Sequence, residues 1–164
     1  MSPSRAVAIF FGAGLLRPAP GTWGSVVAIL IGLLIDRYLG FPALAFAALA
    51  AIGWGFWAVE RELGSRWGED PSEFVIDEVA GQWIALLFPS AAFWSRGWEG
   101  WMPWPGWVAA FLFFRLFDIW KPWVIGRADR RGDAAGVMLD DLWAGLFAGM
   151  AVVIAAGIAH GVLM

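Results

Sequence analysis

Five apolar stretches are separated by more polar segments along the chain. They are Trp23–Ile35, Phe41–Val59, Phe74–Phe88, Trp107–Trp120 and Leu142–Ala159. None of them shows the two-residue alternation of a half-buried strand, and long runs rich in Leu, Ala, Gly and Trp favour helices. A further apolar segment, residues 6–15, is long enough for a short helix lying against the others. The pattern therefore predicts an all-α fold.

The composition predicts that these helices lie in a membrane. Apolar residues make up 60% of the 164 residues, and the mean hydropathy is +0.68, well above the usual range for globular proteins. Several of the 13 Trp residues flank apolar stretches, as expected at a water–hydrocarbon boundary. Only the second and fifth stretches approach the roughly 20 residues that cross a bilayer. We expect one domain, residues 1–164, forming a multi-helix integral membrane bundle of about five main helices plus short or re-entrant segments.

Basic residues predict the orientation of this bundle. With a cytoplasmic N-terminus, five spans place segments 1–22, 60–73 and 126–134 in the cytoplasm and segment 89–106 on the opposite side. The cytoplasmic side then carries Arg5, Arg17, Arg61, Arg66, Arg127, Arg130 and Arg131. The opposite side carries only Arg37 and Arg96. Because cytoplasmic loops are enriched in Lys and Arg, this asymmetry favours a cytoplasmic N-terminus.

Other features exclude several classes of function. A net charge of −3, with no stripe of basic residues, excludes nucleic-acid binding. The absence of Cys excludes disulfides, thiolate metal sites and cysteine phosphatases. His160 is the only histidine and lies at the far end of the last stretch, so a phosphatase that needs two histidines is excluded too. A metal-activated water remains as the route to phosphate-ester hydrolysis.

Five carboxylates fall at the predicted cytoplasmic ends of three helices. Asp77 and Glu78 open the third helix, Asp118 lies near the end of the fourth, and Asp140 and Asp141 open the fifth. Charges beside hydrocarbon cost on the order of 2.5–3.5 kcal/mol each, so they need partners. Each acidic pair alone is also explained by the positive end of a helix dipole. Together they favour a magnesium site, since clustered carboxylates suit a hard divalent cation, with both pairs as metal ligands.

Basic side chains follow in the same region. Arg115, Asp118 and Lys121 are three residues apart, which places them along one helix face. One interpretation is a charge-neutralised stripe that holds the bundle together. In the other, Lys121 binds a phosphate with help from Arg115 or Arg127, while Asp118 contacts the metal. Pro122 removes a backbone donor, so the helix should kink or end there.

The segment 18–25, rich in Pro and Gly, opens the first helix. Free backbone N–H groups at such a start, with the Thr22 and Ser25 hydroxyls, suit a phosphate oxygen. Thr22 is equally explained as an N-cap, with Ser25 an ordinary first-turn residue.

A short sequence echo links the two acidic pairs. An Ala-Gly step follows each pair, ending at Gly81 and at Gly145. Small residues at these positions allow a neighbouring helix to approach closely.

Three blocks of the sequence together resemble the phosphatidylglycerophosphatase A family. The blocks are Pro20–Ser25, then Asp70–Pro71 with Val75–Gln82, then Phe114–Pro122 with Gly136–Gly145. The resemblance implies a magnesium-dependent, multihelical phosphatase of the inner membrane that converts phosphatidylglycerophosphate to phosphatidylglycerol. It maps the family's acidic motifs onto Asp77, Glu78, Asp118, Asp140 and Asp141. Val124 departs from the family pattern, which commonly has a proline there, and segment 89–106 lies outside the resemblance.

We therefore expect a hydrolase that removes the terminal phosphate of phosphatidylglycerophosphate at the cytoplasmic face of a bacterial inner membrane. Its partners are the phospholipid substrate and membrane lipid, whereas its oligomeric state, the number of metal ions and the first nucleophile stay open. A carboxylate-metal head-group or prenyl transferase is one alternative, but its D-x-x-x-D or D-G-x-x-A-R patterns do not occur in usable form. A proton-coupled transporter is another, disfavoured because the acids gather on one side.

Overall fold

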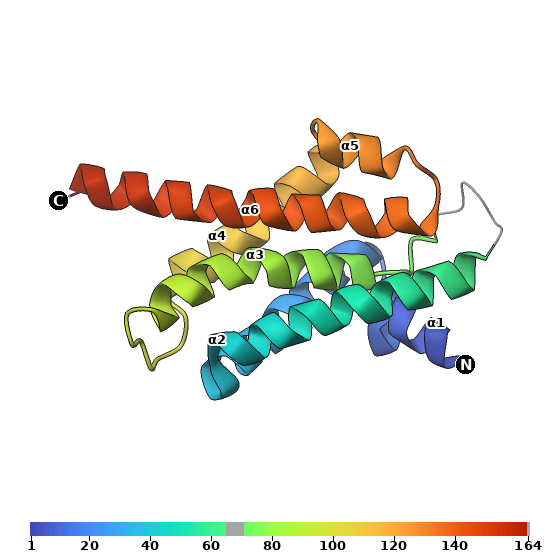
Figure 1. Cartoon of the computed structure of the whole chain (residues 1–164), viewed down its shortest axis with the longest axis horizontal. Coiled ribbons are helices and arrows are strands. Elements are labelled where there is room, and N and C mark those ends of the chain that lie inside the picture. Colours follow the sequence, from blue (N-terminus) through green and yellow to red (C-terminus); the bar gives the residue numbers. More distant parts are fainter. Residues whose placement is uncertain (65–70, 164) are drawn as a thin grey trace.

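Helices make up all the regular structure of the described residues. The computed structural model describes residues 1–64 and 71–163, and no strand occurs within these ranges, which confirms the all-α prediction. In chain order the elements are α1 (Pro3–Ala8), the 3-10 helix η1 (Phe10–Leu15), α2 (Pro20–Leu63), α3 (Ile76–Trp94), α4 (Trp104–Trp120), α5 (Val124–Asp129) and α6 (Ala134–Leu163) (Figure 1). Arg66 and Asp70, used in the sequence predictions, lie outside the described residues.

The long helix α2 reverses its direction at Gly40. This residue has φ 79° and ψ 177°, a conformation that glycine adopts without steric cost. Gly24, before the break, packs against Val75. Gly55, after the break, packs against Ile76, so both halves of α2 pass the start of α3 (Figure 1). The break falls between the first two predicted helices, which are the two halves of α2.

Within residues 1–64 and 71–163, two helices are long and apolar enough to cross a membrane. They are the helix Pro20–Leu63 and the stretch Ala134–Gly161 of α6. Large apolar side chains are exposed on the outer faces of α2, α4 and α6, among them Leu30, Leu34, Phe46, Leu49, Leu112, Ile119, Ile154 and Ile158. Apolar surface of this extent is typical of contact with lipid or with another protein. Two helices that could span a bilayer, together with these exposed apolar faces, agree with the membrane location that the composition predicts.

The start of α2 differs from the prediction. The helix begins at Pro20 and not at Trp23, because the fixed φ of proline suits the first helical position. Ala19 occupies the N-cap position and offers no side-chain hydrogen bond. Thr22 therefore lies inside the first turn, and its alternative assignment as the N-cap is wrong.

The start of α6 differs more. Asp133 accepts a hydrogen bond from the Gly136 backbone N–H (2.7 Å), so the helix starts at Ala134, about two turns before the predicted start. The Arg131 guanidinium, 2.8 Å from Asp133, lowers the pKa of this capping carboxyl. The pair Asp140-Asp141 was predicted at the helix start and is instead well inside α6, whose first turn holds no acidic residue. The helix dipole therefore does not explain that pair.

The end of α4 agrees with the prediction from Pro122. The last helical residue is Trp120, and Lys121 follows in a left-handed conformation with φ 49° and ψ 53°. The Lys121 backbone N–H donates to the Phe117 carbonyl oxygen at 2.8 Å and closes the helix. The regular spacing from Asp118 to Lys121 along one helix face is consequently lost.

The backbones of α3 and α6 meet at Gly81 and Gly145. A Cβ atom at Gly81 would overlap the carbonyl oxygen of Asp141, and one at Gly145 would overlap the carbonyl oxygen of Gly81. The two helices run side by side here (Figure 1), and only glycine permits this separation. The close approach predicted from the two Ala-Gly steps is confirmed. This contact between the two helices brings the acidic pair of α3 close to the acidic pair of α6.

We expect Gly145→Ala to lower the free energy of unfolding by about 1–3 kcal/mol, because the added methyl group forces α3 and α6 apart. Thermal unfolding of the detergent-solubilised protein measures this. The matched control is Gly157→Ala on the same helix, where a Cβ meets no described atom within 4 Å. Equal unfolding temperatures for the two variants would contradict the backbone contact.

Candidate functional site

Three carboxylates from two helices form the centre of the candidate site. Asp77 and Glu78 of α3 and Asp141 of α6 each offer one oxygen atom, and these oxygens lie within 4.8 Å of one another. Only 7% of Asp77 and 4% of Asp141 is exposed. The Oε2 atom of Glu78 is buried and has no hydrogen-bond partner among the described residues. A site whose metal ligands are all oxygen atoms suits a hard cation such as magnesium, so these three residues fit the expected metal. We call them the carboxylate trio.

The local charge balance also favours a cation. Two further carboxylates lie close enough to interact electrostatically with the trio: Asp118 with Asp141, and Asp140 with Asp77. Arg115 and Lys121 are the basic side chains bound to this group. Five carboxylates and two basic groups leave three negative charges uncompensated if all are ionised. Buried charges without partners are strongly destabilising, and a divalent cation would remove most of this excess.

Asp140 differs from the trio because it has a protein partner. Lys121 Nζ lies 2.7 Å from Asp140 Oδ2 and also donates to Asp129. Burial opposes the charge on Lys121, but these two carboxylates outweigh it and raise the pKa of Lys121 above its ordinary value. Of the predicted charge-neutralised stripe, Arg115 pairs with Asp118, whereas Lys121 pairs with Asp129 and Asp140 and so ties the end of α4 to α5 and α6.

A group suited to phosphate lies beside the trio, at the start of α2. Arg115 Nη1 donates to Asp118 Oδ2 at 2.5 Å, and Arg115 Nη2 lies 3.4 Å from the Thr22 hydroxyl. A Cβ atom at Gly21 would overlap Glu78 Oε1 and would lie 3.7 Å from Arg115 Nη1. Glycine at this position therefore leaves room for a guanidinium, a hydroxyl and a carboxylate of the trio to converge on the first turn of α2.

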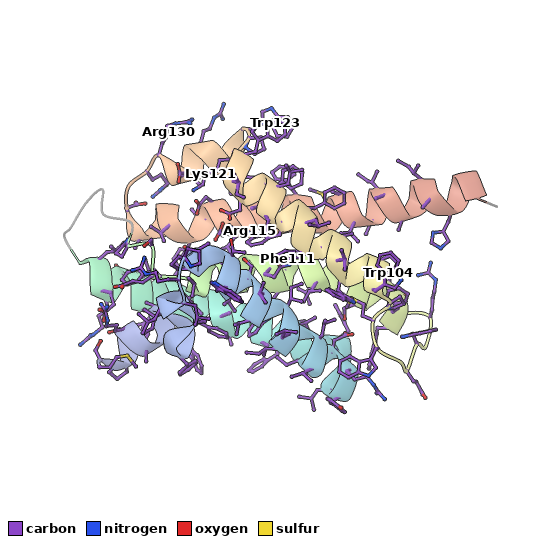
Figure 2. The ribbon with its side chains drawn as sticks, turned by 180° about the vertical axis from the view of Figure 1, so that it is seen from behind. Trp104, Phe111, Arg115, Lys121, Trp123 and Arg130 are labelled. Atoms are coloured by element: carbon purple, nitrogen blue, oxygen red, sulfur yellow. The ribbon has the colours of Figure 1, made fainter. Side chains whose placement is uncertain are left out.

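The remaining residues predicted to bind phosphate lie differently. Ser25 is fully buried, and its hydroxyl donates to the Gly21 carbonyl oxygen at 3.0 Å within α2. Arg127 is exposed on α5. Figure 2 shows α4 running from Trp104 past Arg115 to Lys121, with α5 beyond it. Arg115 thus reaches the trio's surroundings directly, whereas Arg127 lies at the surface.

Gln82 was not predicted as a site residue. It is fully buried one turn after Glu78, and neither of its amide atoms has a hydrogen-bond partner among the described residues. One feature of the sequence could have pointed to this residue: the chain has no Asn and a single Gln, so Gln82 is its only side-chain amide. Its spacing of four residues from Glu78 places both side chains on one helix face.

Comparisons with known proteins agree with the resemblance seen in the sequence. The model of the family described as phosphatidylglycerophosphatase A matches residues 6–156. A Bacteroides thetaiotaomicron protein, whose name proposes phosphatidylinositol-3-phosphatase activity, is 37% identical over 150 residues, covering 88% of both chains.

Two further relatives are each named phosphatidylglycerophosphatase A. The Haemophilus influenzae protein is 34% identical over 90% of this chain and 85% of its own. The Escherichia coli protein is 33% identical over 88% of this chain and 78% of its own. No solved structure is significantly similar to the chain.

We expect Mg²⁺ or Mn²⁺ to raise the unfolding temperature of the detergent-solubilised protein, because a ligand at 100 times its Kd stabilises a fold by about 2.7 kcal/mol. Asp141→Asn should abolish this rise, since it removes one oxygen donor of the trio. Asp36→Asn is the control, because Asp36 pairs with Ser90 at the other end of α3. A rise that persists in Asp141→Asn would exclude the trio as the cation site.

Proposed function

This chain belongs to the phosphatidylglycerophosphatase A family and is a phosphatidylglycerophosphatase, and on that premise we propose how it works. The enzyme removes the terminal phosphate of phosphatidylglycerophosphate with magnesium held by Asp77, Glu78 and Asp141. The observation that carries this proposal is the meeting of the three carboxylates within 4.8 Å beside the Arg115–Thr22 pair.

Each side chain of the site then has a distinct role. Magnesium, when bound, supplies the electrophile that polarises phosphoryl oxygens and favours ionisation of the attacking water. Arg115 binds the non-bridging oxygens of the terminal phosphate, assisted by Thr22, because a guanidinium presents several donors to such oxygens. Asp118 holds that guanidinium in place through its 2.5 Å hydrogen bond. Lys121 holds Asp140 beside the trio.

We also propose that the two halves of α2, α3, α4 and α6 cross the bilayer. At a rise of about 1.5 Å per residue, the 19 residues of α3 and 17 of α4 extend about 28 and 26 Å, close to the roughly 30 Å of a hydrocarbon core. The third span is thus longer than its predicted apolar stretch. Because Asp77 and Glu78 lie in its first turn, the trio falls near the head-group plane, where a lipid phosphate lies.

The distribution of arginines supports a cytoplasmic site. Arg5 pairs with Glu73 just before α3, at 2.7 Å, and Arg61 lies in the last turn of α2. Arg131 lies three residues before the first residue of α6, and α6 starts at the same end of the bundle as α3 (Figure 1). Arg96 follows the other end of α3. This excess of positive charge at the trio's end is typical of cytoplasmic segments.

Phosphatidylinositol 3-phosphate is a second candidate substrate. It is favoured by the name of the Bacteroides thetaiotaomicron relative, which is 37% identical to this chain. Both lipids carry a terminal phosphomonoester, so the same cation and guanidinium chemistry serves either one. The family model and two named relatives favour phosphatidylglycerophosphate.

We expect the purified protein in mixed micelles to release phosphate fastest from phosphatidylglycerophosphate, more slowly from phosphatidylinositol 3-phosphate and slowest from phosphatidic acid. Chelation should stop the reaction and added Mg²⁺ should restore it. Asp77→Asn should reduce turnover more than about 100-fold, since loss of outer-shell metal partners alone costs 10–100-fold.

Asp36→Asn, away from the trio, is the control and should retain turnover. Unchanged turnover in Asp77→Asn would remove Asp77 from the site. Fastest release from phosphatidylinositol 3-phosphate would establish the second candidate in place of the first.

A further inference from the structure

The only side-chain amide of the chain, Gln82, lies one turn beyond the carboxylate trio and has no hydrogen-bond partner among the residues that the structure describes. Gln82 has no exposed surface, and both Oε1 and Nε2 are unpaired within the part of the chain that the structure describes. Buried polar groups are paired in the great majority of native structures, and an unpaired amide is destabilising. A residue of this kind indicates a partner from outside the protein chain.

The neighbours of Gln82 show which way it faces. Gly81 lies against the backbone of α6, and Trp83 Nε1 donates to the Ala28 carbonyl oxygen of α2 at 2.8 Å. Successive helical residues differ by about 100°, so Gln82 faces between α6 and the first half of α2. Glu78, one turn earlier, enters the same space, since its Oε1 lies beside Gly21. Gln82 therefore lines the inner side of the candidate site.

The unpaired atoms suit a hydroxyl group. Glu78 Oε2 and Gln82 Oε1 are acceptors, and Gln82 Nε2 is a donor. A phosphate oxygen without a proton only accepts hydrogen bonds, whereas a hydroxyl both donates and accepts. An amide that presents one donor and one acceptor is thus complementary to a hydroxyl.

The position of Gln82 along α3, relative to the trio, indicates which hydroxyl of the substrate it can reach. This step rests on the proposed function. Gln82 lies four residues beyond Glu78, about 6 Å further from the head-group end of α3. A lipid that presents its terminal phosphate to the trio directs its acyl chains into the bilayer. The part of the head group just on the acyl side of that phosphate is the glycerol carbon next to the scissile ester, which carries a free hydroxyl.

We propose that the Gln82 amide binds this free head-group hydroxyl. Its Oε1 accepts from the hydroxyl, and its Nε2 donates to the hydroxyl oxygen. Gln82 is then a specificity residue: it favours phosphomonoester lipids with a free hydroxyl next to the ester over phosphatidic acid, which has none there.

The test combines two substrates with two enzymes. The substrates are phosphatidylglycerophosphate and its analogue lacking the head-group hydroxyl, and the enzymes are the wild type and Gln82→Met, which keeps the side-chain length but removes both polar atoms. The wild type should prefer the hydroxylated lipid by about 10–100-fold in kcat/KM. Gln82→Met should lose activity on that lipid alone and thereby lose the preference.

Two further measurements separate binding from a structural role. Gln82→Met should keep the Mg²⁺-dependent rise in unfolding temperature, and without substrate it should unfold no earlier than the wild type, because it replaces an unpaired amide. Ser90→Ala removes a different buried polar group, at the other end of α3, and should keep the substrate preference.

Equal losses on both substrates in Gln82→Met would overturn the proposal, since the amide would then act on the catalytic groups. Equal rates of the wild type on the two substrates would also overturn it, and this measurement needs no variant. Absence of phosphate release from phosphatidylglycerophosphate by the wild type is a different result, which would overturn the proposed function and the role of Gln82 with it.

Discussion

The backbone contact between α3 and α6 is the constraint on which the site depends. Gly81 and Gly145 have no side chain to separate the two helices, so each backbone meets the carbonyl groups of the other. The acidic pairs lie about one turn from these glycines, and the carboxylates of the trio therefore come within 4.8 Å. A methyl group at either glycine would widen this separation and draw the trio apart.

Close packing of this kind concentrates negative charge where water is scarce. Arg115 and Lys121 neutralise part of it, each through a carboxylate of its own, Asp118 and Asp140. Among the described residues neither basic group forms an ion pair with the trio, although Arg115 lies beside Glu78, so an excess of negative charge remains if all the carboxylates are ionised. Native structures accept such local instability mainly at functional sites. The same excess favours binding of a divalent cation and, through it, of a phosphate ester.

Polar groups are arranged in layers along the first turns of α3. The trio occupies the layer nearest the helix start, beside Arg115 and the first turn of α2. Gln82 forms the next layer inward, and beyond it the facing helices are joined by apolar side chains such as Leu86. This order matches the outer part of the proposed head group, in which the terminal phosphate is followed by the glycerol hydroxyl.

Residue patterns alone determined the helical class, the separation of the first two helices between Ile35 and Phe41, the end of α4 at Pro122 and the family, because each depends on local backbone chemistry or on motif identity. The same patterns identified the five acidic residues as candidate site residues and the two Ala-Gly steps as points where helices approach closely. They misplaced the start of α6, since its cap depends on the loop that brings Asp133 to Gly136. Only the tertiary structure separated the trio from Asp140 and showed that Gln82 is buried without a hydrogen-bond partner among the described residues. Which charges face one another, and which polar atoms lack a partner, depends on contacts between helices far apart in the sequence.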